Sequence, residues 1–151
     1  NYIFANPLTS SLSSSLVNMD IPAAKETASK LAGLGAGLTP AGDDFMVGAL
    51  HAAWILHPQD VASVLGGEVA ESAAGLTTSL SGAWIWSAGR GEAGELWHRF
   101  FAALTAGAES DIQKSIDQIL SVGETSGADA LAGFIAAMHG WAEKQFPVSD
   151  R

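Results

Sequence analysis

Apolar side chains recur along most of the chain at intervals of three and four residues, the spacing that places them on one face of an α-helix. Clear examples are residues 23–34, 40–56 and 111–122. No stretch alternates apolar and polar residues strictly enough to predict a β-strand. We therefore predict an all-α fold, a compact bundle of about seven helices in which two pseudo-repeated helices are central.

The segment 40–56 is apolar on all sides, with bulky residues such as Phe45, Leu50 and Trp54 spread around the predicted helix. A helix without a polar face is usually buried. We predict that this helix is the centre of the bundle and that His51, which lies within it, is a core residue rather than a ligand.

A glycine-rich stretch precedes this helix, with five glycines in the sixteen residues 33–48. Thr39 suits a helix cap, Pro40 suits the first helical position, and Asp43 and Asp44 follow near the positive end of the helix dipole. Backbone N–H groups at such a helix start are a ready site for an anion or a polar ligand. The pattern predicts a binding site here.

Residues 123–133 repeat this arrangement with a loop one residue shorter. Asp44 and Asp129 are each followed by glycine four residues later and by alanine eight residues later. These positions share one helical face, so each helix has a carboxylate above a stripe of small residues. We predict that the two stripes pack together and bring both aspartates to one polar pocket. The alternative is that the aspartates only complement the helix dipoles and the glycines only permit close packing.

A third motif, residues 77–81, has four hydroxyl-bearing residues in five positions before an apolar segment. Thr77 or Thr78 is expected to cap the helix that follows. Capping does not explain Ser79 and Ser81, which either face solvent or bind a ligand.

Composition excludes several classes of function. The net charge is −9 with only seven Lys and Arg residues, so we expect no nucleic-acid partner and no membrane-surface binding. The chain has no cysteine, which excludes disulfides and thiolate chemistry. We expect a cytoplasmic protein. Its predicted parts are an N-terminal segment 1–22, which continues from a preceding region and whose first seven residues suit the tail of a strand, a helical domain 23–145, and a tail 146–151.

The three motifs in order, 33–45 in the pattern GLGxGLTPxGDDF, 77–81 and 123–133, resemble a bacterial family. That family includes a subunit of the oxamate carbamoyltransferase of anaerobic allantoin breakdown. Its members typically have a preceding N-terminal region, so the resemblance implies that this chain is the C-terminal helical part of a longer α+β protein. It also implies partner subunits and a ligand such as carbamoyl phosphate or an oxamate-like molecule.

Carbamoyl transfer needs donors for a phosphate and a carbonyl, which the loop amides and the motif hydroxyls could supply. The carboxylates would repel a bare phosphate. Either a cation such as Mg²⁺ bridges Asp44 and Asp129 to the ligand, or the aspartates accept N–H groups of a neutral ureido moiety. The predicted catalytic residues are Asp43, Asp44 and Asp129, and the predicted ligand-binding residues are Gly35, Gly37, Thr39, Gly42, Thr77, Thr78, Ser81, Thr125, Ser126 and Gly127.

No arginine lies in the motifs, and Arg90 is the nearest candidate for anion recognition. Three function classes therefore stay open. The first is a carbamoyltransferase-type subunit that acts only with partners. The second is a stand-alone magnesium-dependent hydrolase of the ADP-ribosyl-glycohydrolase type, and the third is a non-catalytic binding or scaffold domain.

Overall fold

The computed structural model describes residues 6–148 of the 151-residue chain. Over these residues it contains eight α-helices, one short 3₁₀ turn and no strand, which confirms the all-α prediction. The predicted strand tail falls largely on residues 1–5, outside the described part. The helices are α1 (Pro7–Val17), α2 (Ile21–Leu31), α3 (Ala41–Leu56), α4 (Gln59–Ala73), α5 (Ser79–Gly89), α6 (Glu95–Ala106), α7 (Glu109–Leu120) and α8 (Ser126–Gln145).

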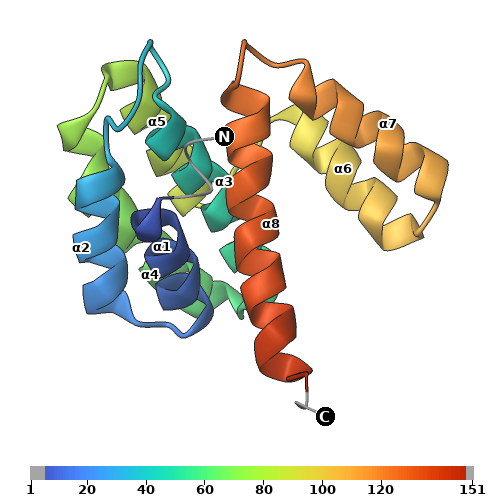
Figure 1. Cartoon of the computed structure of the whole chain (residues 1–151), viewed down its shortest axis with the longest axis horizontal. Coiled ribbons are helices and arrows are strands. Elements are labelled where there is room, and N and C mark those ends of the chain that lie inside the picture. The colour runs from blue at the N-terminus through green and yellow to red at the C-terminus, as the bar shows by residue number, and fades with distance from the viewer. Residues whose placement is uncertain (1–5, 149–151) are drawn as a thin grey trace.

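Helices α3 and α8 are the predicted pseudo-repeated pair, and they pack against each other along the middle of the molecule (Figure 1). Helices α1, α2, α4 and α5 lie on one side of this pair, and the hairpin of α6 and α7 lies on the other. Phe45, Met46 and Leu50 of α3 are fully buried at the centre. The prediction of a central α3 is therefore confirmed.

The closest contact between α3 and α8 occurs at Gly48 and Gly133. A Cβ atom at Gly48 would overlap the carbonyl of Ala130, and one at Gly133 would overlap the carbonyl of Phe45. Only glycine leaves room for backbones at this separation, so the small-residue stripes read from the sequence determine how near the two helices come.

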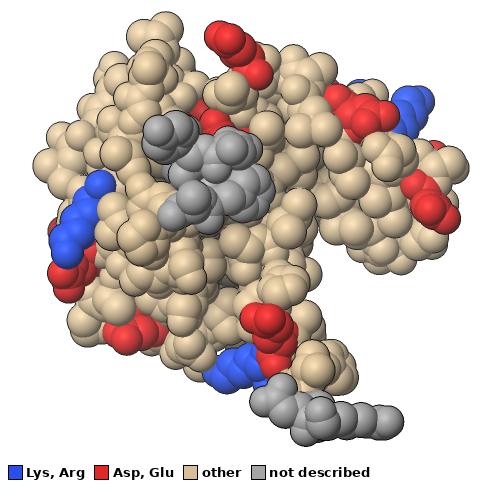
Figure 2. Space-filling model, in the orientation of Figure 1, with Lys and Arg blue, Asp and Glu red and all other residues tan. Residues whose placement is uncertain are grey.

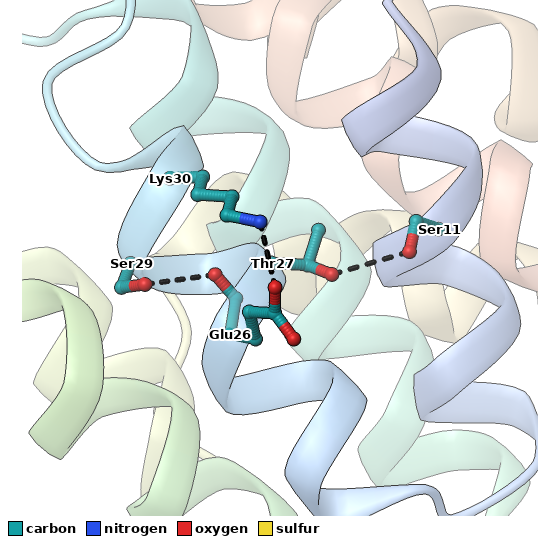
Figure 3. A network of polar contacts seen from close by, with 5 residues as sticks. All are labelled: Ser11, Glu26, Thr27, Ser29 and Lys30. Atoms are coloured by element: carbon teal, nitrogen blue, oxygen red, sulfur yellow. Dashed lines mark hydrogen bonds and ion pairs between the residues drawn. The ribbon is translucent and has the colours of Figure 1, made fainter.

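Helix α1 is rich in serine, a weak helix former, yet it packs into the core through Leu12 and Leu16. Its buried hydroxyls are satisfied locally: Ser13 donates to the carbonyl of Thr9 at 2.9 Å. Residues 7–17, assigned from the sequence to a separate N-terminal segment, thus share the core of the helical domain. Ser11 also links α1 to α2 by a 3.2 Å hydrogen bond with Thr27 (Figure 3).

Helix α4 continues through Gly66 and Gly67, and Gly66 lets it approach the backbone of Gly89. The predicted cap of α3 is wrong. The cap of α3 is Pro40, and Thr39 makes no capping bond because its hydroxyl contacts Ser126 on the other loop. The end of α8 at Gln145 coincides with the predicted start of the tail.

On the face shown in Figure 2, most of the surface carries no charged side chain, and acidic groups stand among few basic ones. Within residues 6–148, no helix has the length and apolar character needed to cross a bilayer.

The α3–α8 contact can be tested with one substitution. We expect Gly133→Ala to lower the free energy of unfolding by about 3 kcal/mol, because the new methyl group forces the two backbones apart. The matched control is Gly140→Ala on the same helix, where a Cβ would meet Val17 only at an ordinary 3.8 Å. That control should stabilise the helix by roughly 0.5–1 kcal/mol. Equal effects of the two substitutions in urea unfolding would contradict the close contact.

Candidate functional site

The starts of α3 and α8 lie side by side, as the repeat predicts. The hydroxyl oxygens of Thr39 and Ser126 are 2.7 Å apart, so the two glycine-containing loops are bonded directly to each other. Asp44, in the first turn of α3, and Asp129, in the first turn of α8, lie behind this contact. The structure thus brings together Thr39, Asp44, Ser126 and Asp129 from segments more than eighty residues apart in the chain.

Asp44 is the most perturbed carboxyl of this group. Its Oδ2 atom is buried and accepts no hydrogen bond. Desolvation raises the pKa of Asp44 from 3.8 to about 6, and the negative charge of Asp129 adds to this effect, while the hydroxyls of Ser126 and Thr39 beside the carboxyl oppose it. Near neutral pH the protonated and ionised forms of Asp44 are therefore both accessible.

Asp129 is 3% exposed, and burial raises its pKa as well. The hydroxyl of Thr125 partly offsets this rise by hydrogen bonding to the carboxylate. Two carboxyls that share a partly desolvated site disfavour each other's ionisation. The negative charge of Asp129 accordingly contributes to the raised pKa of Asp44.

Asp43 points to a different side of α3 and supports the loop. The carboxylate is 1% exposed, accepts the backbone N–H of Gly33 at 2.9 Å, and also accepts the hydroxyl of Thr77. Both of its oxygens are thus used to hold the glycine-rich loop against the segment before α5. The structure gives Asp43 a positioning contact, and its predicted catalytic role remains a prediction.

The hydroxyls of the 77–81 motif also bind the loop. Thr78 caps α5, as expected, and donates to the carbonyl of Leu38 at 2.7 Å. Ser81 is buried and donates weakly to the same carbonyl at 3.4 Å. Gly35 and Gly37 allow the loop its turns, since both have positive φ, of 127° and 91°. These residues surround the loop rather than the pocket described next.

Two backbone amides that the sequence suggested as free donors are already bonded. The N–H of Gly42 donates to the carbonyl of Leu34 at 2.8 Å, and that of Gly127 donates to the carbonyl of Val122 at 3.1 Å. These two N–H groups are therefore not free donors, because the loops fold back on themselves, and ligand binding at Gly42 and Gly127 remains a prediction.

A cavity of about 470 Å³ opens beside the paired tips, between α3, α8 and the α6–α7 hairpin. Its volume lies within the range of about 300–1,000 Å³ that is usual for small-molecule sites. Thr39, Asp44 and Ser126 form its polar end, and His51 and Ala130 are buried residues of the lining. Its rim is formed by exposed residues, namely Trp84, Glu92, Glu95 and Val122. The lining also includes Val47, Leu96, Trp97, Ile119 and Gly127.

One protein-family profile, described as oxamate carbamoyltransferase subunit AllH, matches residues 31–138 and so most of the chain. The chain belongs to the AllH family. The matched region begins just before the glycine-rich loop, ends within α8, and includes every residue named so far in the cavity. No curated protein and no solved structure matches the chain.

The cavity of this AllH-family chain contains residues that the sequence reading did not assign to a site. His51 was expected in the core, and it is buried, but it also lines the cavity. The sequence contained a signal for the place of His51 in the cavity, since residues 44, 47 and 51 share one face of α3. Trp97 had no local signal, because it reaches the cavity only through the docking of α6. Arg90, the proposed anion-binding residue, is exposed and bonded to Glu92 at 3.1 Å.

The donor set for a magnesium ion at Asp44 and Asp129 is small. Asp43 is committed to Gly33 and Thr77, and no three His, Asp or Glu side chains within residues 6–148 gather as a metal-binding group. Two carboxylates and two hydroxyls fall short of a protein-only cation site, although Mg²⁺ often uses few protein ligands with substrate oxygens. Magnesium at this AllH-family site remains a prediction, and no chemical step is assigned to it.

The supporting role of Asp43 predicts a stability effect. We expect Asp43→Ala to lower the free energy of unfolding by about 2–3 kcal/mol, because it leaves the Gly33 N–H and the Thr77 hydroxyl without their partner. Asp44→Ala should change stability much less, since Oδ2 has no hydrogen bond to lose and burial already disfavours the ionised carboxyl, which offsets the loss of the Ser126 and Thr39 hydroxyl interactions. Chemical unfolding of both variants checks this, and a larger loss for Asp44→Ala would contradict the division of roles.

The raised pKa of Asp44 predicts a pH-dependent effect on stability. The folded state favours the protonated acid, so the cost of ionising Asp44 is absent below about pH 4 and fully present above about pH 6. Asp44→Asn should therefore raise the free energy of unfolding at about pH 7.5 by roughly 1–2 kcal/mol, discounted for partial exposure of the carboxyl, and by little at about pH 4. The exposed control Asp60→Asn should show no such trend. A gain for Asp44→Asn that is the same at both pH values would contradict the raised pKa.

Proposed function

We propose that this chain is a subunit of a carbamoyltransferase-type complex and that it binds the amide end of a small substrate at the paired tips of α3 and α8. Membership of the AllH family supports the complex. The observation that carries the choice of site is Asp44, whose buried oxygen lacks a hydrogen bond at the polar end of a cavity of ligand size.

The chemistry of this end suits an N–H donor. A carboxylate accepts hydrogen bonds from the NH₂ group that carbamoyl phosphate and oxamate share, and the hydroxyls of Thr39 and Ser126 can each donate or accept beside it. A ligand N–H group directed at this carboxyl would satisfy the oxygen that the protein leaves without a partner.

The same end is unsuited to the anionic half of either molecule. The acidic side chains of the lining are Asp44, Glu92 and Glu95. Glu92 and Glu95 are paired with Arg90 and Arg99 at 3.1 and 2.6 Å, whereas no basic side chain is bonded to Asp44 within residues 6–148. We infer that the phosphate or carboxylate points out of the cavity, where cationic groups of a partner subunit meet it. The chain by itself would then bind the amide without catalysing transfer, and the assembled complex would be active.

Ligand-induced stabilisation tests this proposal. At about ten times its dissociation constant a ligand adds about 1.4 kcal/mol, which raises the melting temperature of a domain of this size by about 3–5 °C. We expect oxamate or carbamoyl phosphate to produce such a rise with the unmodified chain and none with Asp44→Ala. The matched control Asp60→Ala removes an exposed carboxylate from the first turn of α4, away from the cavity lining, and should respond like the unmodified chain.

The proposal fails if Asp44→Ala and the unmodified chain respond equally, because the ligand would then lie elsewhere. It also fails if neither molecule stabilises the chain and Asp44→Ala leaves the activity of the assembled complex unchanged. A response that requires added Mg²⁺ and is lost in Asp129→Ala would support the bridged form of the same site.

A further inference from the structure

An exposed apolar stripe runs along the start of α5 and onto the glycine-rich loop. Leu76, Leu80 and Trp84 follow one another at intervals of four residues, and the last two share the outward face of α5. Leu38 of the loop, 74% exposed, joins them, because its carbonyl accepts the hydroxyl of Thr78, the cap of α5. We call Leu38, Leu76, Leu80 and Trp84 the α5 stripe.

The α5 stripe lies on two segments that carry no charge. Residues 31–42, which include the loop, and residues 72–89, which include α5, contain no Asp, Glu, Lys or Arg. A single exposed leucine is ordinary on a protein surface, whereas adjoining exposed apolar side chains mark a contact with another molecule. Few charges and an exposed tryptophan are typical of the centre of a protein–protein interface.

The α5 stripe reaches the opening of the cavity. Trp84 belongs to both, since it is 51% exposed and lines the cavity together with Thr39 and Asp44. Leu38 is the neighbour of Thr39 in the chain. A protein that covers the stripe would therefore stand beside the polar end, where the anionic half of a ligand bound at Asp44 would emerge.

A second copy of this chain is poorly suited to that position. Two copies that each carry a net charge of −9 repel one another. Within residues 6–148 the arginines are Arg90 and Arg99, which are bonded to glutamates at 3.1 and 2.6 Å. The described part of a second copy would thus bring no unpaired arginine to the opening. A different, basic chain is attracted to this acidic one and can supply the missing cations.

We propose that the α5 stripe is the docking surface for a different subunit of the complex, one with an apolar patch flanked by Arg or Lys side chains. The patch covers the stripe, and the flanking cations reach the opening of the cavity and meet the anionic half of the ligand. This inference rests on the proposed function for the need of cations there, and it adds the face on which they arrive and the chemistry of the chain that carries them.

The docking surface is tested by Leu80→Gln, which makes the centre of the stripe polar at a position outside the cavity lining. Leu80 is exposed and glutamine is a good helix former, so the variant should fold. We expect the purified companion subunits of the complex to bind this variant about tenfold more weakly than the unmodified chain in calorimetric titration, because the amide loses water without gaining a partner.

Leu104→Gln is the matched control. Leu104 is 40% exposed and Leu80 is 46% exposed, but Leu104 lies on α6, in the hairpin on the other side of the α3–α8 pair (Figure 1). This variant should bind the companion subunits as tightly as the unmodified chain does.

Salt separates a basic partner from a second copy. Raising the salt concentration from about 0.05 M to about 0.5 M should weaken binding of the companion subunits severalfold, since attraction between exposed opposite charges is screened. The chain alone should sediment as a monomer at both concentrations. Association of two acidic copies would instead become stronger as salt screens their repulsion.

The inference is overturned if the companion subunits do not bind the unmodified chain, if they bind Leu80→Gln as tightly, or if salt does not weaken the binding. A dimer of the chain alone that Leu80→Gln dissociates also overturns it, because a second copy then covers the stripe.

The response of the free chain to oxamate tests the proposed function separately, since Leu80 is outside the cavity lining. If oxamate stabilises the chain through Asp44 but Leu80→Gln assembles normally, the inference fails and the proposed function stands. If Leu80→Gln weakens assembly as expected but neither oxamate nor carbamoyl phosphate stabilises the chain and Asp44→Ala leaves the complex fully active, the docking surface stands and the proposed ligand is wrong.

Discussion

The near-contact of two helix backbones, α3 and α8 at Gly48 and Gly133, is the constraint on which the rest of the molecule depends. It fixes the separation and relative rotation of the helices, and so it brings their first turns to the same place. The bond between Thr39 and Ser126 can form only because this separation is small. The desolvation of Asp44 has the same origin, since the start of α8 covers part of its carboxyl. The close packing of small residues therefore also determines the electrostatics at the polar end of the cavity.

Much of this arrangement could be predicted from the sequence because it is encoded by spacing. The interval of four residues between Asp44 and Gly48, repeated at Asp129 and Gly133, defines a helical face, and matched faces of small residues pack closely. The apolar circumference of α3 likewise placed that helix at the centre. Such features depend on periodicity within one helix or on a simple match between two, and both can be read without knowing the path of the chain.

The separate roles of the polar residues could not be predicted from spacing in the same way. Asp43 and Asp44 are adjacent and chemically identical, yet one supports the loop and the other faces the cavity, because successive helical residues point about 100° apart. Which of the two side chains faces the loop depends on where the segment before α5 lies in the folded chain. Trp97 reaches the cavity only after α6 has docked, and Gly42 loses its free amide only after the loop folds back on Leu34.

The α6–α7 hairpin gives the cavity an unusual kind of wall. Where α3 and α8 meet through their backbones, α6 meets them through aromatic side chains, with Trp97 and Phe100 against Phe134 at centre separations of 5.7 and 5.4 Å. Of these three rings only that of Trp97 lines the cavity, so the side chain at position 97 sets the width there without taking part in the contact between Gly48 and Gly133.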